Sequence, residues 1–208
     1  MGLIVGTDFD NTLANFGQSI HAVAHEWGLI GENVERTKRG IRDHIRRSPE
    51  GDIAWQRVQA AVYGPRMAAA RLFDGVAAFF QDCRDRSVPI HIVSHKTAVA
   101  AFDTTGTNLR EAALAWMERN GFFRADALGM TPERVHFAST RAEKIALIGR
   151  LGCTHFVDDL EETFLEPGFP PDVEKILFAP ARPATVPPGV RVASAWSDIG
   201  PYVFSTNL

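Results

Sequence analysis

Cysteine is scarce in this sequence, which has only Cys83 and Cys153 among its 208 residues. Both lie among apolar neighbours, and their wide separation lacks the close spacing of metal-binding cysteines. A single disulfide between them is conceivable on composition alone. We expect two reduced, packed thiols in a cytoplasmic protein instead, because disulfides seldom persist in that compartment.

Long hydrophobic runs are also missing. No apolar stretch approaches the ~20 residues that a membrane-spanning helix requires, so no membrane association is expected. The first eight residues lack the basic start and the long apolar stretch of a secretory signal. Gly6 stands where the myristoylation motif requires Ser or Thr. Together these absences predict a soluble, cytoplasmic protein.

The sequence has no excess of basic charge. Its 22 Lys and Arg residues are outnumbered by 25 Asp and Glu residues, which gives a formal net charge of −3. Binding to duplex nucleic acid requires a concentrated basic surface, so nucleic acid is not expected to be the main partner. The remaining composition, with 45% hydrophobic and 23% charged residues, is ordinary for a soluble globular protein.

What the sequence does contain is an alternation of short apolar runs and helical patterns. Apolar runs that end in polar residues are typical of buried parallel strands whose C-terminal ends open into a site. Such runs occupy residues 3–5, 89–93, 155–157 and 175–178, with a weaker one at 135–137. Amphipathic helical patterns over 76–83 and 109–117 lie between them. This order predicts an α/β fold with a doubly wound parallel sheet.

One segment interrupts the alternation. From about residue 14 to residue 72 only helical patterns occur, beginning with a face formed by Phe16, Ile20, Val23, Ala24 and Trp27. A charged stretch over 32–47 and a third helix over 52–63 follow. We interpret residues 14–72 as a small helical cap inserted after the first strand, and residues 1–13 and 73–208 as the α/β core. The proline-rich segment from residue 167 onward is expected to form short strands and loops at the sheet edge.

Carboxylates gather at two of the predicted strand ends. Asp8 and Asp10 follow the first strand, and Asp158 and Asp159 follow the strand over 155–157. Ligands of open parallel sheets bind where the C-terminal ends of the strands meet, so these side chains are expected to share one pocket. Two like charges ~4 Å apart cost about 4 kcal/mol at an effective dielectric of ~20. A hard, oxygen-preferring cation such as Mg²⁺ is therefore expected between them.

Ser94 and Lys144 add groups that suit an anion. Ser94 closes the strand over 89–93 and offers a hydroxyl donor, whereas Lys144 lies near the start of a predicted helix over 142–151 and offers a cation. An acidic metal site beside a hydroxyl and an ammonium group suits a phosphate dianion. The sequence therefore predicts a magnesium-dependent site for a phosphoryl group.

In their order and spacing, these residues resemble the four motifs of the haloacid dehalogenase-like (HAD) hydrolases. The stretch DFDNTL at 8–13 is similar to the first motif, Ser94 to the second, Lys144 to the third, and Asp158-Asp159 to the fourth. Asn11 departs from the pattern, because many relatives carry Gly at this position. Asn tolerates unusual backbone angles better than most residues, so we expect the turn to be kept.

The resemblance implies a role for each motif residue. Asp8 would be the nucleophile that attacks phosphorus and forms an aspartyl phosphate. Asp10 would protonate the leaving oxygen and then activate the water that releases phosphate. The residues assigned to Mg²⁺ are Asp8, Asp10 (through its backbone carbonyl), Asp158 and Asp159. Those assigned to the phosphoryl group are Thr12, Ser94, His95 and Lys144.

Asp10 also favours one reaction within the family. The dehalogenase members lack the second aspartate, since a halide leaving group needs no proton, so the resemblance implies a small phosphorylated metabolite as substrate. Two alternatives stay open within the family: a sugar phosphomutase and a member that binds without catalysis. A phospho-receiver domain fits poorly because Lys144 precedes Asp158. A glycosyltransferase fits poorly because seven residues before Asp8 leave no room for a nucleotide-binding unit.

The charged stretch of the predicted cap contains further candidates for substrate binding. Arg39, Arg42 and Arg46 share one helical face and would suit a second anionic group. The interpretation we favour is a solvated basic face balanced by neighbouring acidic residues such as Asp43. Lys96, in the polar loop after the strand over 89–93, is another candidate substrate contact.

Overall fold

The computed structural model describes residues 2–181, 183 and 185–205 and contains a six-stranded parallel sheet in the order β5-β4-β1-β6-β7-β8. Its strands are β1 (Val5–Thr7), β4 (Ile90–His95), β5 (Val135–Ala138), β6 (His155–Asp158), β7 (Glu174–Phe178) and β8 (Val190–Ala193). The chain winds outward from β1 to β4 and β5, then returns to β6 on the other side of β1. This reversal confirms the predicted doubly wound sheet and makes the end of β1 its switch point.

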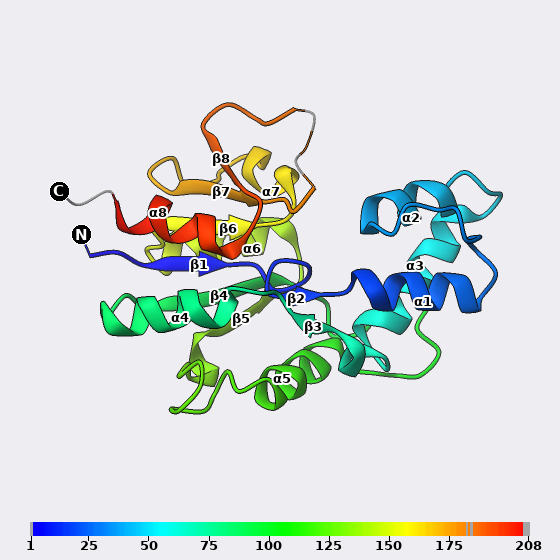
Figure 1. The fold of residues 1–208 in the computed structure, drawn as a ribbon, viewed down its shortest axis with the longest axis horizontal. Coiled ribbons are helices and arrows are strands. Elements are labelled where there is room, and N and C mark those ends of the chain that lie inside the picture. The colour runs from blue at the N-terminus through cyan, green and yellow to red at the C-terminus, as the bar shows by residue number, and fades with distance from the viewer. Residues whose placement is uncertain (1, 182, 184, 206–208) are drawn as a thin grey trace.

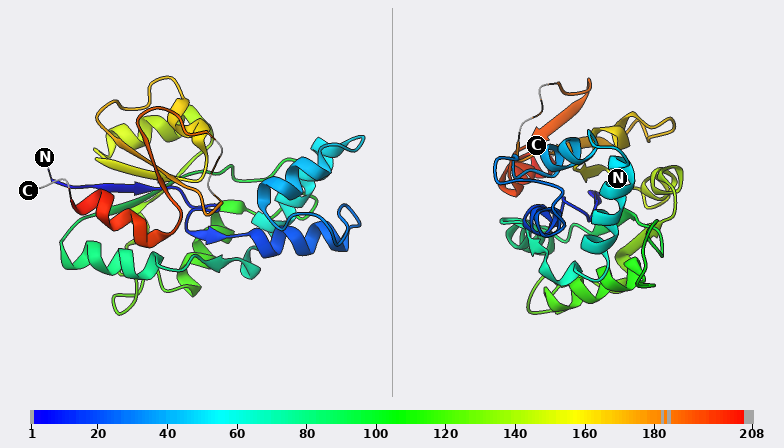
Figure 2. Two further views of the ribbon diagram at one scale, coloured as in Figure 1. Left: turned by 45° about the horizontal axis from the view of Figure 1, so that its top comes forward. Right: turned by 90° about the vertical axis from the view of Figure 1, so that its right-hand side faces the viewer.

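Helices cover both faces of the sheet (Figures 1 and 2). One face carries α4 (Val76–Asp85), α5 (Leu109–Arg119) and α8 (Ile199–Phe204), and the other carries α6 (Arg141–Arg150) and α7 (Glu161–Leu165). Three single 3₁₀ turns complete the helical structure: η1 (Met67–Ala69), η2 (Pro132–Arg134) and η3 (Trp196–Asp198). A separate apolar cluster forms on each face, one including Trp116 and Trp196 and the other including Ile148 and Phe156.

The predicted strands are all present, and the proline-rich segment adds β8 at the sheet edge, as expected. The sequence patterns did not predict α7 and α8. These helices contain only 5 and 6 residues, too few for a helical period to stand out from the background.

Both cysteines are free and buried, as predicted. Burial raises the pKa of the Cys83 thiol to about 12 and that of Cys153 to about 11. The thiolate is the reactive form of cysteine, so these two side chains are packing groups in this fold.

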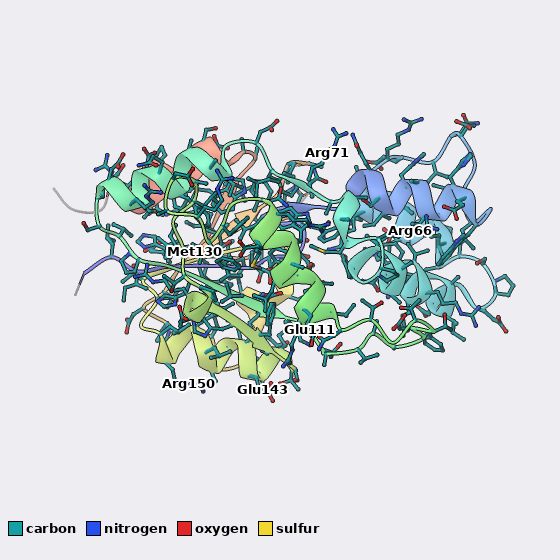
Figure 3. The ribbon with its side chains drawn as sticks, turned by 90° about the horizontal axis from the view of Figure 1, so that it is seen from below. Arg66, Arg71, Glu111, Met130, Glu143 and Arg150 are labelled. Carbon is teal, nitrogen blue, oxygen red and sulfur yellow. The ribbon has the colours of Figure 1, made fainter. Side chains whose placement is uncertain are left out.

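The segment after β1 forms a helical cap beyond the C-terminal ends of the strands (Figure 1). Its helices α1 (Gly17–Glu26), α2 (Lys38–Ile45) and α3 (Gly51–Tyr63) all contact one another. The chain enters the cap through β2 (Ala14–Asn15) and leaves it through β3 (Arg71–Leu72), which pair antiparallel. Figure 3 shows the cap and core from below, with Arg66 on the cap and Glu111 and Glu143 on core helices.

The predicted domain boundaries, at 13/14 and 72/73, fall just before β2 and just after β3. The division of the chain into two domains at these points stays a prediction.

One expectation within the cap is wrong. Trp27 does not share the buried face of Ile20 and Val23, because α1 ends at Glu26 and the Trp27 side chain is 42% exposed. No helix in the described part of the chain has the length and apolar character needed to cross a membrane.

Candidate active site

The strand register brings the two pairs of aspartates together. Thr7 of β1 lies opposite Val157 of β6, so Asp8 and Asp158 occupy equivalent positions at the ends of neighbouring strands. The Asp8 backbone N–H donates a 2.8 Å hydrogen bond to the Val157 carbonyl, which fixes this alignment. Carboxylate oxygens of Asp8, Asp158 and Asp159 all lie within 4.8 Å of one another. The three side chains therefore form one acidic cluster at the switch point of the sheet.

A tight turn follows Asp8. The Phe9 carbonyl accepts hydrogen bonds from the backbone N–H groups of Thr12, Leu13 and Ala14. Asn11 has a φ of 62°, in the left-handed region. This confirms that asparagine keeps the turn, since its short polar side chain makes that region more accessible than for most residues.

Lys144 pairs with two of the three carboxylates of the acidic cluster. It sits in the first turn of α6, which begins after Thr140, whose hydroxyl accepts a hydrogen bond from the Glu143 backbone N–H. The Lys144 ammonium lies 2.7 Å from Asp8 and 2.6 Å from Asp158. Burial by itself would lower the pKa of Lys144, but the Asp158 and Asp8 carboxylates outweigh burial and raise it. Lys144 is therefore a fixed cation in the buried site.

Three ionised carboxylates would carry more negative charge than this lysine balances. Burial raises the pKa of Asp8 to about 8, against the opposing effect of Lys144 and with further raising contributions from Asp158, Asp159 and Asp10. Burial also raises the pKa of Asp159. A divalent cation would restore the charged form of these groups, and three carboxylates at this separation are the oxygen donors that Mg²⁺ prefers. The residues present thus fit a magnesium ion.

Lys38 reaches the cluster from the cap. Its ammonium lies 3.0 Å from the Asp159 carboxylate, although Lys38 begins α2. The Asp159 carboxylate raises the pKa of Lys38 above its ordinary value despite the opposing effect of burial. The sequence alone does not single out this residue, because nothing in a stretch of adjacent basic residues distinguishes the one that reaches the core.

The Asp10 carboxylate pairs with a different lysine. It lies 2.8 Å from the ammonium of Lys96, which follows β4 and is buried. That ammonium also lies over the Tyr63 ring, at 5.2 Å from its centroid, and over the Phe9 ring, at 5.7 Å. Asp10 is thus outside the acidic cluster, and its assigned contact with Mg²⁺ through the backbone carbonyl stays a prediction. Lys96, predicted as a substrate contact, pairs with the predicted acid–base residue.

The remaining predicted phosphate-binding residues are two buried hydroxyls and one exposed histidine. The hydroxyls of Ser94 and Thr12 have no hydrogen-bond partner among the residues described, which costs about 1–3 kcal/mol for each. Neither residue is among those that line the two cavities between cap and core. His95 is exposed, and its Nε2 lies 3.2 Å from the Ser139 carbonyl oxygen. Their assigned contacts with phosphate stay predictions.

The basic face of the cap pairs with acidic residues of the cap itself. Arg39 and Arg42 lie 3.9 Å and 2.8 Å from Asp43, and Arg46 lies 2.8 Å from Asp52. Arg39 is 76% exposed. This arrangement supports the solvated basic face over a dedicated site for a second anion.

Two cavities lie between cap and core. The smaller, of about 340 Å³, contains Asp8, Asp10 and Lys144 in its lining. The larger, of about 1050 Å³, is lined mainly by residues of the cap, several of them charged, and also by the loop after β7. Lys38 and Asp159 line both, so their ion pair forms part of the boundary between them. Asp8 is therefore exposed to the smaller cavity and not to the larger one.

Comparison with known proteins gives a likeness in fold. No protein-family model matches the sequence, and no curated protein matches it. A HAD family hydrolase from Deinococcus radiodurans, solved with bound phosphate and sodium, superimposes with a TM-score of 0.57 at 15% identity, over 97% of this chain and 95% of that chain.

Two further solved structures are named for two different activities. A dehalogenase with an intermediate complex gives a TM-score of 0.55 at 12% identity, over 96% of each chain. A phosphoserine phosphohydrolase-like protein from Francisella tularensis gives 0.50 at 12% identity, over 98% of this chain and all of that one. At such identities the likeness establishes the architecture of core and cap, and the chemistry has to be argued from the site.

Proposed function

We propose that this chain, which has the fold of the haloacid dehalogenase-like hydrolases, is a magnesium-dependent phosphohydrolase that cleaves a small phosphomonoester through an aspartyl-phosphate intermediate. The observation that carries the proposal is the convergence of Asp8, Asp158 and Asp159, the first two of which pair with the buried ammonium of Lys144. An acidic cluster with an embedded cation suits phosphoryl transfer, which depends on positioning and on neutralising charge.

The acidic cluster would hold the metal. Asp8, Asp158 and Asp159 are the side chains that would bind Mg²⁺. When bound, the ion supplies positive charge to the phosphoryl oxygens and to the Asp8 carboxylate. Lys144 stays next to Asp8 and offsets the remaining negative charge of nucleophile and phosphoryl group.

Asp8 and Asp10 would share the two half-reactions. A carboxylate oxygen of Asp8 forms a bond to phosphorus while the bond from phosphorus to the ester oxygen breaks, and Asp10 gives its proton to that leaving oxygen. In the second half-reaction Asp10 takes a proton from water, whose oxygen bonds to phosphorus while the bond to Asp8 breaks. Free Asp8 and inorganic phosphate result, with Asp10 protonated again.

Asp10 supports ester hydrolysis over dehalogenation, because an alkoxide leaving group needs a proton and a halide leaving group does not. A phosphomutase would have to hold a second phosphate in the cap. The cap arginines Arg39, Arg42 and Arg46 are already paired with Asp43 and Asp52, so the phosphatase is the better supported of the two.

The test is phosphate release from para-nitrophenyl phosphate, measured with Mg²⁺ and after chelation with EDTA. We expect release that requires both Mg²⁺ and Asp8, so the Asp8→Asn protein, purified in parallel, serves as the control for contaminating phosphatases. Halide release from a 2-haloacid without phosphatase activity would identify a dehalogenase instead. Isomerisation of a sugar phosphate without net phosphate release would identify a mutase.

A further inference from the structure

One face of α3 forms a wall of the smaller cavity. Gln56, Gln59, Ala60 and Tyr63 all line it, at the spacing i, i+3, i+4 and i+7 that places residues on a single helix face. This wall belongs to the cap, whereas Asp8 belongs to the core. A substrate with its phosphorus at Asp8 would therefore present its leaving group to this face of α3.

The lining of the cavity divides into a charged part and an uncharged part. The loop after β4 and the start of α5 contribute another uncharged surface, formed by Thr97, Ala100, Ala101 and Leu109. The charged lining residues come from the strand ends, from the starts of α2 and α6, and from the segments that follow β4 and β6: Asp8, Asp10, Lys38, Lys96, Arg141, Lys144 and Asp159. The walls formed by α3 and by the 97–109 segment carry no charge among their described lining residues.

The cations of the charged part already have acidic partners. Lys144 pairs with Asp8, Lys96 with Asp10 at 2.8 Å, and Lys38 with Asp159 at 3.0 Å. The remaining cation, Arg141, pairs with Glu166 at 2.6 Å. Phosphate and Mg²⁺ would take over the groups at the acidic cluster, and Mg²⁺ would free the Lys38 ammonium, at the boundary with the larger cavity. No other cation lining the smaller cavity, within the described chain, is left for an anionic group on the leaving side.

The uncharged part does offer hydrogen bonds. The side-chain amides of Gln56 and Gln59 are half-buried and form no hydrogen bond to any described residue. The Tyr63 hydroxyl accepts a 3.3 Å hydrogen bond from the Asn11 side chain and keeps its own proton to donate. Each amide can donate two hydrogen bonds and accept two, which suits hydroxyl groups.

We infer that the substrate is a phosphomonoester whose leaving group is small, uncharged and rich in hydroxyl groups, of the sugar or polyol class, and that Gln56 and Gln59 recognise it. This inference rests on the phosphohydrolase proposed above. The cavity volume of about 340 Å³ lies at the lower end of the range for ligand pockets, about 300 to 1,000 Å³, and so favours a small leaving group. A carboxylate or second phosphate placed against the walls formed by α3 and the 97–109 segment would lack a counter-ion, which is costly.

The first experiment compares substrates that differ in one group. Glycerol 3-phosphate and 3-phosphoglycerate share a three-carbon skeleton, and only the second has a carboxylate on its leaving group. We expect kcat/KM with Mg²⁺ to be at least about tenfold higher for glycerol 3-phosphate, and a hexose 6-phosphate to exceed fructose 1,6-bisphosphate similarly. Equal or higher values for the anionic member of each pair would overturn the inference and leave the phosphohydrolase intact.

The second experiment tests the glutamines. For Gln56→Leu and Gln59→Leu, the ratio of kcat/KM for the better polyol phosphate to that for para-nitrophenyl phosphate should fall about five- to tenfold each. Gln56→Glu and Gln59→Glu, which preserve shape, should lower the ratio in the same direction. Gln18→Leu, on the exposed surface of α1, is the matched control and should not change it.

The outcomes separate the two proposals. An unchanged ratio in all four cavity variants would overturn the role of the glutamines, provided that each variant unfolds at a temperature similar to the parent protein. No phosphate release from any ester, the aryl phosphate included, would contradict the phosphohydrolase proposal itself, and the inference would fall with it.

Discussion

The Lys96 ammonium lies 2.8 Å from the Asp10 carboxylate, at the end of β4 and with only 2% of the lysine side chain exposed. The pair is held between the rings of Phe9 and Tyr63, so it joins the turn after β1 to helix α3 of the cap. An ion pair of this kind keeps a carboxylate in a fixed place. In the proposed mechanism that carboxylate has to exchange protons, which makes Lys96 a positioning residue for Asp10.

Replacing Lys96 tests this relationship. Lys96→Met should lower kcat/KM for an alkyl phosphate about tenfold or more and that for para-nitrophenyl phosphate less, because a displaced Asp10 carboxyl protonates the leaving oxygen less well. Lys96→Arg should restore part of the activity on the alkyl phosphate. The measurement is the ratio of kcat/KM for the two substrates, and equal losses on both would indicate a purely structural role.

The acid role of Asp10 makes a prediction about leaving groups. An alkoxide needs a proton more than an aryl oxide does, so Asp10→Asn should slow hydrolysis of an alkyl phosphate about 10²–10⁴-fold and that of para-nitrophenyl phosphate much less. The two substrates are compared at saturating Mg²⁺ with the same protein preparations. Equal losses on both would show that Asp10 does not protonate the leaving oxygen.

Lys38 and Mg²⁺ should compete for the same carboxylate. Lys38 lies 3.0 Å from Asp159, so Lys38→Met removes a nearby cation and should tighten Mg²⁺ binding, on the order of tenfold. Isothermal titration with Mg²⁺ alone measures this change without any substrate. Arg39→Met is the matched control, since Arg39 is exposed and pairs with Asp43. Weaker binding in Lys38→Met would contradict this arrangement.

A histidine pair on the sheet predicts how stability depends on pH. The rings of His91 on β4 and His136 on β5 approach to 3.2 Å, and burial lowers the pKa of both below 6.5. The unfolded chain therefore binds more protons than the folded one just below pH 6.5. The contribution to stability is complete above that pH and is lost as the pH falls toward the folded-state values.

The free energy of unfolding should fall between pH 7 and pH 5 in both the parent protein and His136→Gln. We expect the fall in the parent to be about 1 kcal/mol larger, because only the parent has both histidines. Urea unfolding at the two pH values measures this difference. His25→Gln, at a half-exposed position on α1, should behave like the parent. Parallel losses in the parent and in His136→Gln would show that the pair is not the source of the pH dependence.

The sequence by itself determined the fold class and the members of the acidic cluster. Alternating apolar runs and helical periods predicted the doubly wound sheet, and the polar residues after those runs predicted that Asp8, Asp158 and Asp159 come together. They do so because parallel strands align their C-terminal ends at one edge, so that a strand-end position in the sequence implies a place in space. Lys144 could be found in the same way, from its position at the start of the helix before β6.

Only the tertiary structure decided which other side chains reach this site. The Lys38 side chain reaches the core, whereas those of Arg39 and Arg42 pair with Asp43 in the cap. The orientation of the cap on the core decides which of these side chains can reach the strand ends. Gln56 and Gln59 carry no local signal, because a polar residue on a helix is usually solvent-facing. The angle at which α3 lies over the strand ends is set by packing between cap and core. Such packing depends on contacts between residues far apart in the chain, which a local pattern does not encode.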